Sequence, residues 1–177
     1  ARTLWHMAYG DHPYGSDGDG SEASVTALTR DDVLAAHRSV LARDRVLIGA
    51  AGDITPAELG AMLDRLLGDL PAAGAALPPR ATYALKPGVT VIDFPGPQAT
   101  VMFAQEGIRQ SDPDFFAANI LNEVLGGGGF SSRLMDEVRE KRGLTYGIGT
   151  GFAAYDLAEL LIGNAAIANE NVGQAID

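Results

Sequence analysis

The hydrophobic and polar positions of residues 112–152 predict a helix, a glycine-rich break, a second helix and a strand. Asp112 followed by Pro113 favours a helix N-terminus, because an aspartate can cap the first turn and proline lacks only an N–H that would be unbonded there. The apolar positions of this helix recur every four residues and are Phe116, Ile120 and Val124. Four consecutive glycines at residues 126–129 then end the helix, because glycine reaches positive φ without steric cost.

The second helix is predicted to begin at Ser131 or Ser132, either of which can cap it, and to end at Gly143. The strand that follows should alternate between two faces. One face is expected to carry Leu144, Tyr146, Ile148, Thr150 and Phe152, and the other Thr145, Gly147, Gly149, Gly151 and Ala153. Because the second face is nearly free of side chains, another backbone could lie close to it.

The N-terminal part of the chain predicts turns, two helices and one strand. Residues 1–28 are rich in Gly, Asp and Ser and are expected to form turns. Residues 29–41 and 55–67 predict helices, each opened by a threonine in a capping box. The second of these has its leucines and methionine along one face, so it should be amphipathic. Residues 45–51 form a short apolar run that predicts a buried strand.

A linker is predicted at residues 71–81, which combine Pro, Gly and Ala without periodicity and with a single charge. Beyond it, residues 89–94 and 99–107 are predicted to form a pair of strands around a proline-rich loop. Residues 158–168 are predicted to pair with the glycine-rich strand across a turn near Asp156.

Net charge and amino-acid composition exclude several kinds of binding partner and of catalytic or metal site. The 177 residues carry a net charge of −10, which argues against nucleic acid and anionic membranes as partners, since both are polyanions. The absence of cysteine excludes disulfides and cysteine-based catalysis or metal binding. No apolar run approaches the ~20 residues that a membrane-spanning helix needs. High usage of Ala, Gly and Arg favours a GC-rich bacterial source, within which we favour the periplasm over the cytoplasm.

Two motifs, LGGGGFSSRL and REKRGLTYG, resemble the pitrilysin/insulinase-type zinc metallopeptidases, a family that includes the mitochondrial processing peptidase. They are similar to the domain that follows the metal-binding domain, and HPYG at residues 12–15 resembles a segment after the metal-binding helices. The resemblance implies that residues 1–70 are the C-terminal part of one α+β domain. Residues 71–82 would then be a linker, and residues 83–177 the N-terminal part of a second, substrate-binding domain.

The fold that the resemblance implies is α+β, with helices packed on a mostly antiparallel sheet. The alternation of strands and helices along the chain would also allow a doubly wound α/β sheet. The two folds differ in strand direction, because a doubly wound sheet is mostly parallel.

The resemblance also implies a substrate-binding site made of Arg139, Tyr146, Gly126, Gly127, Gly128 and Gly129. Arg139 and Tyr146 have the spacing of seven residues at which family members contact the substrate beside the zinc. The glycines stand where the alpha subunit of the mitochondrial processing peptidase has its longer substrate-contacting loop. From the residues alone, Arg139 could instead pair with Asp136, Tyr146 could be an ordinary strand residue, and the glycines could be a hinge. A phosphate-binding loop is disfavoured because no Gly-Lys-Ser/Thr follows.

Zinc is the cofactor implied for the complete enzyme, but we expect no zinc in this chain. The zinc site of the family needs His-x-x-Glu-His on a helix, and none of the three histidines has that spacing. His6 and His12 are expected in a loop, and His37 is expected to pack in a core. We therefore predict no metal ligand and no catalytic residue here, so that the chain alone is inactive. Zinc and the catalytic glutamate would come from outside it.

The predicted function is part of a zinc metalloendopeptidase, or of its metal-free partner subunit, that binds peptide and helps enclose the catalytic chamber. The expected partners are a peptide or unfolded polypeptide and a metal-binding domain or subunit of the same family, in a dimer. No nucleic acid partner and no membrane span are expected. The alternative is a non-enzymatic assembly subunit, like the respiratory-complex core subunits that share the fold.

Overall fold

The computed structural model describes residues 1–176, which divide into two compact units. The first unit joins Ala1–Gly18 to the chain from Pro79 onward, and the second unit is Asp19–Pro78. The chain passes between the units twice, and only the second crossing lies inside the expected linker at residues 71–82. The expected division into two domains around that linker stays a prediction for the complete protein.

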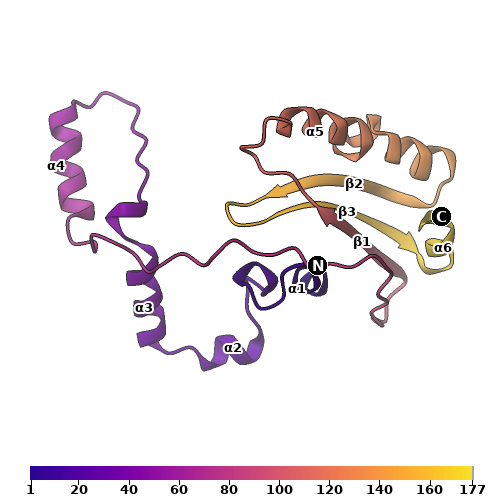
Figure 1. Cartoon of the computed structure of the whole chain (residues 1–177), viewed down its shortest axis with the longest axis horizontal. Helices are drawn as coiled ribbons and strands as arrows, with labels where there is room; N and C mark the ends of the chain where they lie inside the picture. The colour runs from indigo at the N-terminus through magenta and orange to yellow at the C-terminus, as the bar shows by residue number, and fades with distance from the viewer. Residues whose placement is uncertain (177) are drawn as a thin grey trace. The chain divides into compact units, whose positions relative to one another are not determined.

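The first unit is built on one antiparallel sheet of three strands (Figure 1). The strands are β1 Gln98–Glu106, β2 Thr145–Ala154 and β3 Glu159–Ala168, in the order β1-β3-β2. β2 and β3 form the predicted hairpin, in which the N–H of Tyr155 donates to the carbonyl of Ala158 at 2.9 Å. The α+β prediction is confirmed. The doubly wound alternative is wrong, because both strand pairs of the described residues are antiparallel.

A layer of helices and turns covers one face of this sheet (Figure 1). It consists of α5 Phe115–Asn122, the π-helical η3 Glu123–Gly127, the 3₁₀ turn η4 Gly129–Ser131 and the π-helical η5 Met135–Lys141. The ring of Phe115 lies 6.2 Å from that of Phe152 on β2. Buried side chains of the layer and its sheet face include Met135, Val138, Leu144, Ala165 and Ile167. This layer contains the whole predicted substrate-binding stretch except Tyr146.

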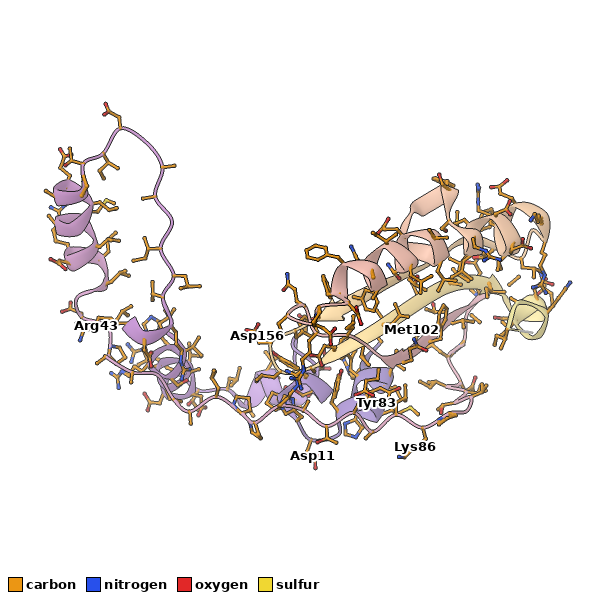
Figure 2. The ribbon with its side chains drawn as sticks, turned by 45° about the horizontal axis from the view of Figure 1, so that its top comes forward. Asp11, Arg43, Tyr83, Lys86, Met102 and Asp156 are labelled. Atoms are coloured by element: carbon orange, nitrogen blue, oxygen red, sulfur yellow. The ribbon has the colours of Figure 1, made fainter. Side chains whose placement is uncertain are left out.

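The opposite side of the sheet packs on α1 Arg2–Tyr9, which is followed by the 3₁₀ turn η1 Pro13–Gly15 (Figure 1). A small core joins Ala8, Tyr9, Ala158 and Leu160, and Tyr83 packs against it (Figure 2). The Tyr9 hydroxyl donates to the carbonyl of Glu159 at 2.9 Å, and burial raises the pKa of Tyr9 to about 12. Near the end of the chain lie η6 Asn169–Asn171 and α6 Val172–Ile176.

The prediction of turns for residues 1–28 is wrong in two places, at α1 and at α2 Glu22–Ala27. In α1, Trp5 and Tyr9 stand one turn apart on the face that packs on the sheet, with ring centroids 6.0 Å apart. Helix formation in α1 is thus favoured by tertiary packing, which residue composition does not report.

The second unit contains α2, α3 Arg30–Val40, the turn η2 Arg43–Arg45 and α4 Pro56–Leu67. Both predicted capping boxes are formed, at the N-termini of α3 and α4. Residues 45–51 are not a strand, and Leu47 is 99% exposed, because this unit offers them no strand to pair with among its described residues. In the first unit, residues 89–94 likewise form no strand, so the predicted pair at residues 89–107 is only half present as β1.

The linker is anchored at both of its ends. On the side of the second unit, the N–H of Ala75 donates to the carbonyl of Ser39 at 3.0 Å. On the side of the first unit, the Pro79 carbonyl lies 2.9 Å from Nε2 of His12. Residues 76–78 stand between these two anchors, so the freedom of the linker is concentrated there.

Limited proteolysis should therefore cut at residues 76–78, or in residues 16–21 before α2, before it cuts any helix. Elastase is a suitable probe because it cleaves after small residues such as Ala76, and the neighbouring Leu77 is 67% exposed. Mass spectrometry of the first fragments identifies the site. Cutting within α4 at the earliest time points would contradict the assignment of the boundary.

Candidate functional site

The first half of the glycine stretch is packed against neighbouring atoms rather than free. A Cβ added to Gly126 would stand 2.4 Å from Oγ1 and 2.9 Å from the backbone N of Thr150 on β2. A Cβ added to Gly127 would stand 2.6 Å from Nδ2 of Asn122. Gly126 is buried and has no room for a side chain, whereas Gly127 is half-buried and its near neighbours are the ends of side chains that can move. Gly126 therefore lets η3 lie directly on β2 at Thr150, a residue of the face that was expected to carry side chains. Of the glycines on the other predicted face, Gly147 and Gly151 have no neighbour within 4 Å of an added Cβ, and Gly149 has only the carbonyl oxygen of Gly126 at 3.3 Å.

The second half, Gly128 and Gly129, is exposed. The N–H of Gly128 donates to the carbonyl of Glu123 at 2.9 Å, which closes η3. Gly129 has φ +60°, a left-handed conformation that favours glycine, and a Cβ there would meet nothing within 4 Å. The turn brings Phe130 to the surface with 74% of its area exposed. Any contact of the glycines with a peptide therefore falls to Gly128 and Gly129.

Arg139 lies in η5, one of two π-helical segments that flank the glycines, and π-helical turns are frequent at functional sites. Its guanidinium forms an ion pair with Glu140, and its Cζ stands 5.0 Å from the centroid of the Phe130 ring. Asp136, the partner that helix spacing suggested for Arg139, pairs instead with Lys141 at 2.8 Å. The guanidinium is therefore held beside the end of the glycine stretch.

Tyr146 is the exposed residue of a β-bulge at the start of β2. The register of β2 on β3 shifts between Thr145 and Ile148, so that residues 146 and 147 bulge out of the ladder. Thr145 is buried, with its Oγ1 2.7 Å from the carbonyl of Ala166, whereas Tyr146 is 84% exposed. The prediction that Tyr146 shares a face with buried Leu144 is wrong, because the bulge rotates Tyr146 out of the alternation.

Arg139 and Tyr146 therefore flank the junction of η5 and β2 with free donor capacity. Among the described residues, no hydrogen bond or ring contact joins the two side chains to each other. The guanidinium carries five N–H donors and the phenol one O–H donor. Donors of this kind bind the carbonyl groups of an extended peptide and stabilise an oxyanion when one develops.

The histidines of the described chain do not fit a zinc site. Nδ1 of His12 accepts the N–H of Tyr14 at 3.1 Å, and its Nε2 faces the Pro79 carbonyl, so both ring nitrogens are engaged. His6 lies on α1 instead of the predicted loop, and His37 is exposed on α3 instead of packed in a core. Residues 1–176 contain no group of three or more His, Cys, Asp or Glu able to hold a metal ion. The HPYG segment serves instead to anchor the linker.

A polar cavity of about 370 Å³ lies at the turn between β2 and β3 and was not predicted from the sequence. Glu159 forms ion pairs there with Arg80 and with Arg109, whose Nε is 3.5 Å from the carboxylate. Arg80 also donates to the carbonyl of Asp156 at 2.9 Å (Asp156 is labelled in Figure 2). Through the contacts of Arg80 with Glu159 and Asp156, the end of the linker is bound to the β2–β3 hairpin. The one signal in the sequence was that Arg80 is the single charge of the linker.

Comparison with known proteins defines the class to which this fold and site belong. Residues 27–177 match the model of the peptidase M16 inactive domain. The chain belongs to this family, which confirms the resemblance found in the motifs LGGGGFSSRL and REKRGLTYG. The coarse part of the functional prediction is thereby confirmed, namely the relation to zinc proteases through the domain described as the peptidase M16 inactive domain.

Two relatives show the breadth of the family. An uncharacterized zinc protease of Streptomyces coelicolor is 32% identical over 150 residues, which are 81% of this chain and 32% of that protein. A probable mitochondrial-processing peptidase subunit beta of Schizosaccharomyces pombe is 30% identical over 128 residues, or 70% of this chain and 28% of that protein. The chain thus spans about a third of the length of these relatives, and it is related to peptidase subunits as well as to bacterial proteins.

Solved structures agree with the fold. The peptidase M16 inactive domain of Pseudomonas fluorescens is 34% identical and superimposes with a TM-score of 0.85 over 99% of this chain and 42% of that one. A chain of complex III from Candida albicans, 19% identical with a TM-score of 0.73 over 96% of this chain and 42% of that one, shares the fold alone. No helix within residues 1–176 has the length and apolar character to cross a bilayer.

Proposed function

We propose that this chain is the peptide-binding part of an M16 zinc metalloendopeptidase, or of its metal-free partner subunit. In this function it forms one wall of the chamber in which peptides are cleaved. Zinc and the catalytic glutamate are supplied by a metal-binding domain or subunit of the same family, in a dimer of domains or of subunits. The substrate is a peptide or an unfolded polypeptide.

The observation that carries the proposal is the exposure of Tyr146. The bulge leaves Tyr146 84% exposed on the strand that packs against η5, the segment that carries Arg139. Bulges of this kind re-aim a side chain next to functional sites. Gly128 and Gly129 add an exposed backbone without side chains, which an extended peptide can approach closely.

Photo-crosslinking tests the proposal without depending on catalysis. A peptide of about 15 residues with a benzophenone side chain is irradiated with the complete protein, and crosslinked residues are mapped by mass spectrometry. We expect crosslinks within residues 128–130 and 139–146, reduced by an excess of unlabelled peptide. Competed crosslinks found only outside these two segments would refute the proposal.

A second candidate is a non-enzymatic subunit that uses the same surface for assembly. It is favoured by one relative, named a non-peptidase homolog of Helicobacter pylori, which is 26% identical over 147 residues, or 82% of this chain and 34% of that protein. The residues of the complete protein outside this chain decide between the two, because only a peptidase needs His-x-x-Glu-His in itself or in its partner.

A further inference from the structure

Phe130 is a large aromatic side chain on the surface, in contact with Arg139. It is 74% exposed, immediately after the glycine stretch, in a turn where a polar residue would avoid the cost of exposed apolar surface. Phe130 nevertheless makes one specific contact, because the Arg139 guanidinium carbon lies 5.0 Å from its ring centroid. This distance is within the range at which an arginine is attracted to an aromatic face.

The turn that carries Phe130 is firmly seated. The N–H of Ser132 donates to the carbonyl of Gly129 at 3.1 Å, and Ser132 itself is completely buried. Its Oγ lies 3.4 Å from the N–H of Met135, which opens η5. The backbone on either side of Phe130 is therefore fixed, and the ring is presented to Arg139 from a defined direction.

Two neighbours, Phe130 and Glu140, restrict the side chain of Arg139. The ring of Phe130 covers its guanidinium, and the carboxylate of Glu140 pairs with it. An unrestrained arginine side chain loses rotamer entropy when it is fixed by a ligand. Contacts that already restrict the side chain in the free protein reduce that loss.

We propose that Phe130 is a positioning residue for Arg139: its ring orients the guanidinium before a peptide binds. This inference rests on the proposed peptide-binding function of Arg139. It gives the glycine stretch a second purpose, because Gly129 is the left-handed turn that aims Phe130 at Arg139. Phe130 acts through Arg139 and not by direct contact with the peptide.

The test uses F130L, which keeps an apolar side chain but removes the ring, and F130Y, which keeps the ring. The control is F116L, since Phe116 is 77% exposed on α5 and, among the described residues, its ring contacts only that of Phe115. In the first arm, NMR of the Arg139 side chain in the peptide-free protein measures the ring-current shift of its δ-methylene protons. F130L should abolish the upfield shift, whereas F130Y and F116L should preserve it.

The second arm measures peptide affinity of the complete protein by fluorescence anisotropy. F130L should weaken binding about 2- to 5-fold, as expected for an exposed cation–π contact, and F130Y should restore it. The loss should vanish in the R139A background, because Phe130 then has nothing to position. A loss that persists in R139A would overturn the inference, and so would unchanged Arg139 resonances in F130L. If R139A itself leaves affinity unchanged while the NMR arm holds, the proposed function of Arg139 fails, and the role of Phe130 in binding fails with it.

Discussion

Replacing Arg139 by alanine or Tyr146 by phenylalanine should each lower peptide hydrolysis by the complete enzyme about 10²- to 10³-fold, as losing one oxyanion donor typically does. A peptide carbonyl gains negative charge as hydrolysis proceeds, and a guanidinium and a phenol O–H aimed at it stabilise that charge. Both residues are exposed or half-buried at the end of η5 and the start of β2, so neither substitution should unfold the chain. Steady-state kinetics with an internally quenched peptide measures the effect.

The design of these variants separates chemistry from packing. Tyr146→Phe keeps the ring and removes only the hydroxyl. Arg139→Lys keeps the charge but loses the planar pair of donors, so it should recover part of the activity. If both residues act on one substrate group, the double variant should lose less than the product of the two single losses. Wild-type kinetics in both single variants, at an unchanged melting temperature, would show that Arg139 and Tyr146 are ordinary surface residues without a role in hydrolysis.

Features governed by neighbours in the sequence could be predicted. The Oγ1 of Thr29 accepts the N–H of Asp32 at 3.2 Å, and Thr55 does the same for Glu58 at 3.3 Å, as the capping-box pattern indicated. Gly143 has φ +62° and ends the second helix where predicted. Such features depend on four or five consecutive residues, so the sequence pattern contains all the information that they need.

Features governed by distant partners could not be predicted. The bulge at Tyr146 depends on how β2 registers on β3, since Thr145 Oγ1 reaches the carbonyl of Ala166, 21 residues away in sequence. The apolar run around Leu47 has the composition of a strand, but a strand also needs a neighbour to pair with. Residues 1–18 pack on the sheet because Tyr9 and Leu160 share one core, and a contact between residues so far apart in the sequence cannot be predicted from a local pattern.

In the candidate site, too, some residues could be predicted from the sequence and others could not. Arg139 and Tyr146 were found because their spacing matches a family motif. Phe130 belongs to the motif LGGGGFSSRL, but its role was missed because the spacing of the motifs does not reveal its contact with Arg139. The packing role of Gly126 was also missed, since four glycines in a row predict freedom, and only the position of Thr150 shows that the first of them is confined.

Gly126→Ala should destabilise the chain by about 1–3 kcal/mol, the usual cost of forcing a side chain into a packed site. The added Cβ would stand 2.4 Å from Oγ1 of Thr150 and 2.9 Å from its backbone N, and a backbone atom cannot rotate away. The helical layer must then lift from β2. We expect the denaturation midpoint to fall, and peptide affinity to fall with it because η3 leads directly into the turn of Phe130.

Gly151→Ala is the matched control, because a Cβ on that glycine of the same strand would meet nothing within 4 Å. Its stability should lie within about 0.5 kcal/mol of the wild type, as for ordinary surface changes. Thr150→Ala offers a partial rescue: Oγ1 of Thr150 makes no hydrogen bond with the described residues, so its removal costs little and opens the tighter of the two clashes. The double variant Gly126→Ala/Thr150→Ala should therefore be more stable than Gly126→Ala alone. Equal stability of Gly126→Ala and Gly151→Ala would show that the glycine stretch is a free loop after all.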